Sequence, residues 1–170
     1  IIATESLGEK KAKEYIDNNY AVCDTRFIID YYRLTEDWRM LFGGGETLTN
    51  KFLKNPHNIV SSRMYKVFPI LKNYKIEFCW GGTLAITVNR FPNFGTTKDD
   101  KIIYAHGYSG HGLALSTLAG KLIAEYINGY PERFNFFSSI PHMSIPSGDL
   151  LRRPLYSLGV MYYKIRDFIH

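Results

Sequence analysis

The stretch Ile102-Ile-Tyr-Ala-His-Gly-Tyr-Ser-Gly-His-Gly-Leu-Ala-Leu-Ser116 combines a short apolar strand, a glycine-rich turn and the start of a helix. Gly107, Gly110 and Gly112 let the backbone pass close to a ligand, because they carry no Cβ atom. The helix expected over Leu113–Ile127 directs its unpaired N–H groups and the positive end of its dipole at the turn. This pattern predicts a site for an anion or an electron-rich ring edge. The alternative is a tight strand-to-helix connection without a ligand.

The composition is typical of a globular chain. The 170 residues correspond to one domain or a large piece of one, and 45% of them are apolar, which is enough for a core. The net charge of +5 comes mostly from basic residues that are scattered or adjacent to acids. Because there is no arginine-rich arm or zinc-ligand spacing, we expect no nucleic-acid partner and no metal. A nucleic-acid-binding module would need a contiguous basic face, and it remains a minor alternative.

Cysteine content and hydropathy favour a cytoplasmic location. Cys23 and Cys79 could pair, but two thiols in a chain of this size do not make a disulfide scaffold. No apolar run approaches the ~20 residues that a membrane span needs. Polar Thr4-Glu5 follows Ile1-Ile2 too soon for a signal peptide. Because the chain begins without methionine in an apparent strand, we expect a fragment or a split product.

Strand and helix patterns follow one another without regular alternation, which predicts an α+β class with a mixed or antiparallel sheet and packed helices. The expected strands are residues 1–4, 20–23, 27–34, 38–42, 75–80, 84–88 and 101–106, with 27–34 and 38–42 forming a hairpin. The expected helices are residues 8–18, 47–71 with a break near Asn55-Pro56 and an N-cap at Ser62, 113–127, and 154–169. We expect loops at 93–100 and 130–151.

Four blocks, in the same order, resemble the D-amino-acid-oxidase-like FAD-dependent oxidoreductases. The blocks are Ile2-Ala-Thr-Glu5, Asp30-Tyr-Tyr-Arg-Leu34 with Leu41-Phe-Gly-Gly44, Trp80-Gly-Gly with Thr87 and Pro92, and Tyr108-Ser-Gly-His-Gly112. The ending, Phe137 to Asp149 followed by Leu151-Arg-Arg-Pro-Leu155, is most similar to the gamma-glutamylputrescine oxidoreductase branch. The resemblance runs from Ile1 to the last expected helix.

The resemblance covers only the C-terminal portion of such an enzyme. The family binds ADP with an N-terminal Rossmann unit that carries G-x-G-x-x-G and a later acidic residue, and neither is found in this chain. The resemblance therefore implies a partial substrate-binding domain at 1–100 and a C-terminal flavin-binding segment with terminal helices at 101–170, without the Rossmann half. It also implies a separate N-terminal FAD-binding partner, or self-association through exposed apolar surface.

The implied activity is FAD-dependent oxidation of an amine. In the family, the flavin takes a hydride equivalent from a C–N bond, and the protein positions and polarises the cofactor. The resemblance places eight residues at the cofactor: Trp80, Gly81, Gly107, Tyr108, Ser109, Gly110, His111 and Gly112. It assigns no catalytic residue. The rival interpretation is a non-catalytic remnant or an interaction subunit that needs the missing half.

Several of these cofactor assignments have two open interpretations. His111 is either a polar contact near the ring or a capping or core histidine. Trp80 packs either near the isoalloxazine or in a core. We expect Ser109 to be the helix N-cap, which would also shape the site. Some relatives attach flavin through a cysteine near the position of Cys79, and the alternative is a buried structural cysteine.

The substrate contacts implied by the resemblance lie in the hairpin. Tyr31 and Tyr32 occupy opposite faces of one strand, so only one can face a pocket, and we choose Tyr32. Arg33 either holds a substrate carboxylate or is a surface or salt-bridged arginine. Ala114 stands where sarcosine-oxidase-like relatives carry a lysine that holds the substrate carboxylate. A longer amine is therefore expected rather than a small α-amino acid.

Overall fold

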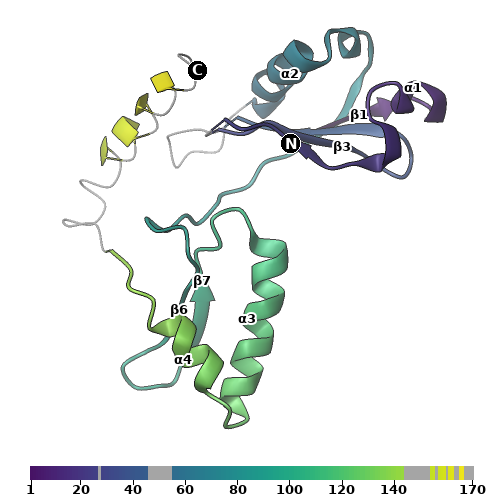
Figure 1. Cartoon of the computed structure of the whole chain (residues 1–170). Helices are drawn as coiled ribbons and strands as arrows, with labels where there is room; N and C mark the ends of the chain where they lie inside the picture. Colours follow the sequence, from purple (N-terminus) through teal and green to yellow (C-terminus); the bar gives the residue numbers. More distant parts are fainter. Residues whose placement is uncertain are drawn as a thin grey trace. The chain divides into compact units, whose positions relative to one another are not determined.

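The computed structural model describes residues 1–26, 28–45, 55–143, 154–155, 157–159, 161–162 and 165–166. They form two compact units (Figure 1). The first comprises Ile1–Gly82 together with the described pieces of the last segment, and the second begins at Thr83 and continues to the described residue Met143. The functional division at residue 100 stays a prediction, because the compact units divide the chain by contacts and not by role.

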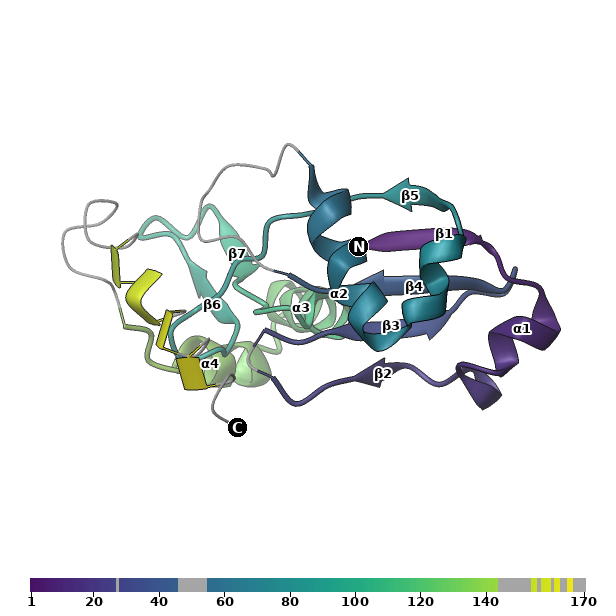
Figure 2. The same ribbon diagram turned by 90° about the horizontal axis from the view of Figure 1, so that it is seen from above.

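A five-stranded antiparallel sheet forms the centre of the first unit, with strand order β2-β3-β4-β1-β5 (Figure 2). Its strands are β1 (Ile2–Ser6), β2 (Val22–Cys23), β3 (Tyr31–Leu34), β4 (Arg39–Gly43) and β5 (Ile76–Cys79). The predicted hairpin is confirmed, because Tyr32 pairs with Phe42 and Leu34 with Met40. The antiparallel sheet with packed helices confirms the predicted α+β class for the described residues.

One helix covers one face of this sheet. The helix α2 (Pro56–Val67) contacts β1 and β4, and the shorter helical elements are α1 (Glu9–Lys13), η1 (Asp17–Asn19) and η2 (Pro69–Asn73). The core between helix and sheet contains Ile2, Leu34, Met40, Phe42 and Met64, none of which is more than 1% exposed. Removal of this apolar surface from water drives the packing of the unit.

Three expectations for the first unit were wrong in their boundaries. The strand expected at 27–34 begins only at Tyr31, because Asp24 Oδ1 accepts hydrogen bonds from the N–H groups of Arg26 and Asp30 and forms a loop there. Ser62 lies inside α2 and is not its N-cap; the helix begins at Pro56, whose fixed φ suits the first helical position. The helix expected over residues 8–18 ends at Lys13. Asn18 has a left-handed φ of 58°, which a residue of a right-handed helix does not adopt.

The second unit packs two helices on a β-hairpin. The elements are β6 (Asn93–Thr96), β7 (Ile103–His106), α3 (Gly112–Ile127) and α4 (Glu132–Ser138) (Figure 1). Phe94 from β6 and Phe134 from α4 pack edge to face, with ring centroids 5.8 Å apart. Ala119 and Leu122 of α3 complete this core.

Three expectations for the second unit were also wrong. Residues 93–96 form the strand β6, although their polar character predicted a loop. The side chain of Phe94 is buried and packs this strand into the core. The helix α4 lies in the expected loop at 130–151, because Phe134 anchors it to the same core. Residues 84–88 do not form a ladder, and only an isolated bridge joins Ile86 to Tyr108.

Some expectations fall outside the described residues. Residues 47–54 of an expected helix are among them, as are parts of 154–169; the described residues of the latter segment are helical. Cys23 and Cys79 are both free and exposed. Within the described ranges, no helix has the length and apolarity needed to span a membrane.

A buried carboxylate ties the start of β3 to α2. Asp30 is only 2% exposed, and Arg63 Nε donates to its Oδ1 at 2.5 Å. Arg26 Nη1 donates to the other oxygen at 3.3 Å, and Arg63 Nη2 donates to the carbonyl of Ile28 at 3.0 Å. Both carboxylate oxygens therefore have charged donors, as a buried charge requires.

Asp30→Ala should lower the free energy of unfolding of the first unit by about 3 kcal/mol, because it leaves Arg63 without its partly buried counter-charge. Urea denaturation measures this loss. The matched control is Glu14→Ala, which removes an exposed pair with Lys11 and should cost far less, because water screens exposed charges. Equal losses in the two variants would contradict the anchoring role of Asp30.

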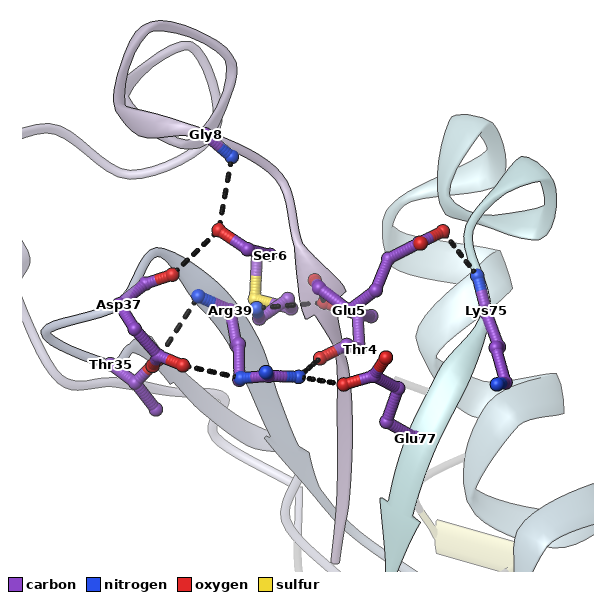
Figure 3. A network of polar contacts seen from close by, with 10 residues as sticks. Thr4, Glu5, Ser6, Gly8, Thr35, Asp37, Arg39, Lys75 and Glu77 are labelled. Carbon is purple, nitrogen blue, oxygen red and sulfur yellow. Dashed lines mark hydrogen bonds and ion pairs between the residues drawn. The ribbon is translucent and has the colours of Figure 1, made fainter.

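A second polar network joins β4 to its neighbours around Arg39 (Figure 3). Arg39 Nε donates to Asp37 Oδ2 at 2.5 Å, and its Nη1 donates to the carbonyl of Thr4 at 2.9 Å and to the carboxylate of Glu77. Thr35 Oγ1 donates to Asp37 Oδ1 at 2.6 Å. The hydrogen bond from Thr35, followed by that from Arg39, lowers the pKa of Asp37.

Because the pKa of Asp37 is lower in the folded state, its contribution to stability is present above its ordinary pKa of 3.8 and is lost as the pH falls through the folded value. The wild-type protein should therefore be more stable than Asp37→Asn at neutral pH, and the difference should narrow below pH 3.8. Urea denaturation of both proteins across this range measures the difference. A difference that stays constant with pH would contradict the assignment.

Candidate functional site

The turn between β7 and α3 has an unusual backbone. Gly107, Ser109 and Gly110 all have left-handed φ angles, of 75°, 49° and 92°. Such angles favour glycine because a Cβ atom crowds the backbone there. The predicted glycine-rich turn is thus confirmed as a turn, and it leads directly into the 16-residue helix α3.

The N-terminus of α3 offers hydrogen-bond donors. The N–H of Leu115 donates to the carbonyl of His111 at 3.1 Å, so the N–H groups of Gly112, Leu113 and Ala114 precede the intrahelical ladder. No side chain of the described residues caps this end, and the first turn of the helix contains no acidic residue. The unopposed dipole and the N–H groups together suit an electron-rich ligand atom.

The extended segment 85–87 lies against the turn. The N–H of Ser109 donates to the carbonyl of Ala85 at 3.0 Å, and the N–H of Thr87 donates to Ser109 Oγ at 3.4 Å. Ser109 Oγ in turn donates to the carbonyl of Gly107 at 3.2 Å. The sequence analysis missed this contact; the only signal was that Thr87 stands in one of the four family-like blocks.

Gly107 and Gly110 are required for different reasons. A Cβ atom on Gly107 would lie 2.6 Å from Cγ2 of Thr87, which is too close for a real contact. A Cβ atom on Gly110 would have nothing within 4 Å. Gly110 is therefore needed only for its φ angle, whereas Gly107 is needed both for its φ angle and for the close approach of Thr87.

The structure corrects two expectations about the turn. Ser109 is not the N-cap, because His111 occupies the N-cap position and the hydroxyl of Ser109 is bonded within the turn. His111 is exposed, and its ring makes no hydrogen bond to any residue that the structure describes. His111 therefore occupies the N-cap position without capping the helix by its side chain, the core interpretation is wrong, and its ring is accessible to a ligand.

Trp80 and Gly81 belong to the first unit, whereas the turn belongs to the second. Trp80 follows β5, its N–H donates to the carbonyl of Ile1 at 2.9 Å, and its side chain is 44% exposed. Neither the core interpretation of Trp80 nor the buried interpretation of Cys79 is correct, since both side chains are exposed. The position of Trp80 and Gly81 beside a flavin stays a prediction.

The two residues predicted to contact substrate lie on β3 in the first unit. Tyr32 stacks on Phe42 with ring centroids 5.5 Å apart and meets Phe68 edge to face at 5.0 Å. Tyr31 is the more exposed of the two tyrosines, and Arg33 is exposed, with its Nε donating to the carbonyl of Leu34 at 3.1 Å. The substrate roles of Tyr32 and Arg33 stay predictions.

A family model described as FAD dependent oxidoreductase matches residues 1–126. The chain belongs to the FAD-dependent oxidoreductase family. It is 42% identical over 167 residues to gamma-glutamylputrescine oxidoreductase of Escherichia coli, a match that covers 98% of this chain and 39% of the relative. It is 40% identical to the probable oxidoreductase OrdL of Haemophilus influenzae, a match that covers 98% of this chain and 38% of that relative. These matches confirm the family resemblance drawn from the four blocks, and this chain spans about two fifths of the length of both relatives.

A solved structure shares the fold. The L-proline dehydrogenase from P. horikoshii superposes with a TM-score of 0.57 at 24% sequence identity. The superposition covers 74% of this chain and 33% of the dehydrogenase. At this identity the likeness concerns the fold alone, and it agrees with the mixed helix and antiparallel-sheet architecture.

Gly107→Ala should destabilise the second unit by about 2 kcal/mol, because Ala disfavours a left-handed φ and its methyl group meets Thr87. Gly110→Ala is the matched control and should cost about 1 kcal/mol, since it carries only the φ penalty. Native-state exchange of the amide of Leu122, which is fully buried in this unit, measures both losses.

The clash itself has a separate test. Thr87→Ser removes Cγ2, so it should recover about 1 kcal/mol in the Gly107→Ala background and nothing in the Gly110→Ala background. Strict additivity of Thr87→Ser with both glycine substitutions would show that Thr87 does not restrict Gly107.

Proposed function

We propose that this chain is part of an FAD-dependent oxidoreductase that oxidises the C–N bond of an amine or amino-acid-like substrate. The observation that carries the proposal is the glycine-rich turn at 107–112, which opens into an uncapped helix N-terminus. Membership of the FAD-dependent oxidoreductase family and the 42% identity to gamma-glutamylputrescine oxidoreductase support it.

The residues of the turn fit one part of FAD. The N–H groups of Gly112, Leu113 and Ala114, with no acidic neighbour in the first helical turn, suit the electron-rich pyrimidine edge of the flavin ring. The accessible ring of His111 supplies a further polar contact. The pyrophosphate has no such partner here, because the 170 residues contain no G-x-G-x-x-G segment. We therefore assign the ring edge to this chain and the ADP part of the cofactor to another region.

FAD, when bound, supplies the acceptor for the hydride equivalent that leaves the substrate. The contribution of this chain is electrostatic, because the N–H donors and the dipole of α3 stabilise negative charge at the ring edge without having to reorganise. Tyr32 and Arg33 are the proposed substrate contacts. The guanidinium of Arg33 is exposed and suits a carboxylate on the substrate.

The proposed substrate class is a longer amine. The first turn of α3 carries Leu113, Ala114 and Leu115, so it offers no cation to hold the carboxylate of a small α-amino acid. The name of the Escherichia coli relative, gamma-glutamylputrescine oxidoreductase, is that of an enzyme for a long amine.

The proposed partner is the remaining part of a full-length family member, or a second copy of the chain. Apart from Lys121, the exposed side of α3 carries small or apolar residues, including Leu113 at 92% and Ile127 at 67%. A helix that is apolar on both sides is normally covered. The match spans only 38–39% of both relatives. Their remaining part is longer than this chain and is available to cover the exposed side of α3.

The cofactor assignment predicts weak binding with little discrimination among flavins. If only the ring edge is held, the full 170-residue chain should bind riboflavin, FMN and FAD with affinities within about threefold of one another, which is less than 1 kcal/mol. Fluorescence quenching of each flavin measures the affinities, and a visible spectrum after removal of excess FAD should show little retained flavin.

Stoichiometric retention of FAD, or a preference for FAD over riboflavin of more than about tenfold, would contradict the assignment. Either result would mean that this chain contacts the ADP part. Failure to bind any of the three flavins would favour the rival interpretation, a non-catalytic remnant or an interaction subunit.

A further inference from the structure

Ser109 stands where glycine would be the easier residue. Its φ of 49° lies in the left-handed region, in which the Cβ atom of a non-glycine residue crowds the backbone. Gly107 and Gly110, its near neighbours with φ angles in the same region, are both glycine. A serine in this conformation therefore needs compensation from contacts of its hydroxyl group.

The hydroxyl group of Ser109 forms a relay between two segments of the second unit. It accepts a hydrogen bond from the N–H of Thr87 at 3.4 Å and donates one to the carbonyl of Gly107 at 3.2 Å. Both contacts are partly buried, and the backbone bond from Ser109 to Ala85, at 3.0 Å, runs beside them. The hydroxyl is thus used as both donor and acceptor, which only a serine or threonine side chain of this size can do.

The relay determines which backbone groups of the turn remain available. The carbonyl of Gly107 is occupied by Ser109 Oγ, and the carbonyl of Tyr108 accepts the N–H of His111 at 2.9 Å. The N–H groups of Gly112, Leu113 and Ala114, in contrast, have no intrahelical partner. With the carbonyls of Gly107 and Tyr108 engaged internally, the three N–H groups at the start of α3 are donors that the turn offers to a ligand.

We infer that Ser109 is a positioning residue that presets the turn at 107–112 for an electron-rich ligand, through the relay from Thr87 N–H to Ser109 Oγ to the carbonyl of Gly107. It acts through the backbone of the turn and not by its own contact with the ligand. The inference rests on the proposed flavin site, and it specifies which side chain maintains the geometry of that site.

The variant Ser109→Gly distinguishes a serine that positions the turn through its hydroxyl group from a residue that only adopts the left-handed φ. Glycine adopts the left-handed φ without cost, so a residue needed only for the turn would be replaced neutrally or with a gain in stability. If the relay holds the turn, Ser109→Gly and Ser109→Ala should both raise the exchange rate of the Thr87 amide about tenfold. The control, Ser116→Ala, changes an exposed serine of α3 and should leave that rate unchanged.

Flavin binding provides the second readout. Riboflavin affinity, measured by fluorescence quenching, should fall about tenfold in Ser109→Gly, which corresponds to about 1.4 kcal/mol, while the melting temperature changes little. An unchanged or slower exchange of the Thr87 amide in Ser109→Gly would overturn the relay. Faster exchange together with unchanged riboflavin affinity would overturn the positioning role.

The two proposals fail in different ways. If the wild-type chain binds no flavin but Ser109→Gly still accelerates exchange of the Thr87 amide, the flavin assignment fails and the relay stands. If the wild-type chain binds riboflavin and Ser109→Gly binds it equally well, the flavin assignment stands and the positioning role of Ser109 fails.

Discussion

The left-handed backbone at residues 107–110 is the constraint on which the candidate site depends. It reverses the chain between β7 and α3 within a few residues, and so brings the start of the helix next to the end of the strand. The reversal demands glycine at positions 107 and 110 and compensation at Ser109, while the close approach of Thr87 leaves no room for a side chain on Gly107. The donor groups at the start of α3 are therefore a consequence of the turn geometry.

Different interactions stabilise the interiors of the two units. In the first, the buried carboxylate of Asp30 and the network around Arg39 connect elements that are distant in the sequence; Asp30 and Arg63, for example, are 33 residues apart. In the second, aromatic packing of Phe94 against Phe134 and Phe137 replaces buried charge. An aromatic cluster tolerates small rearrangements at a lower cost than a buried ion pair does, because it leaves no unpaired charge.

Local sequence patterns predicted the strands and helices whose formation depends on neighbouring residues. The hairpin of β3 and β4, the strand β7 and the helix α3 all follow from periodicity and turn residues. The strand β6 and the helix α4 were missed, because Phe94 and Phe134 provide the only strong signal and their partners lie elsewhere in the chain. In the site, the glycines predicted the turn, but the role of Ser109 depends on Thr87, 22 residues earlier, and no local pattern reports such a contact.

The two free cysteines lie on opposite edges of the five-stranded sheet, Cys23 on β2 and Cys79 on β5. Across the strands, Cys23 pairs with Tyr31, which pairs with Gly43. Cys79 pairs with Ile2, which pairs with Phe42, the residue before Gly43. The two cysteines are therefore offset by only one residue along the strands. Four interstrand spacings separate them, or roughly 19 Å. The native chain therefore carries a pair of thiols at a distance suited to dipolar spectroscopy, and spin labels attached to them would report on the width of the sheet without any engineered residue.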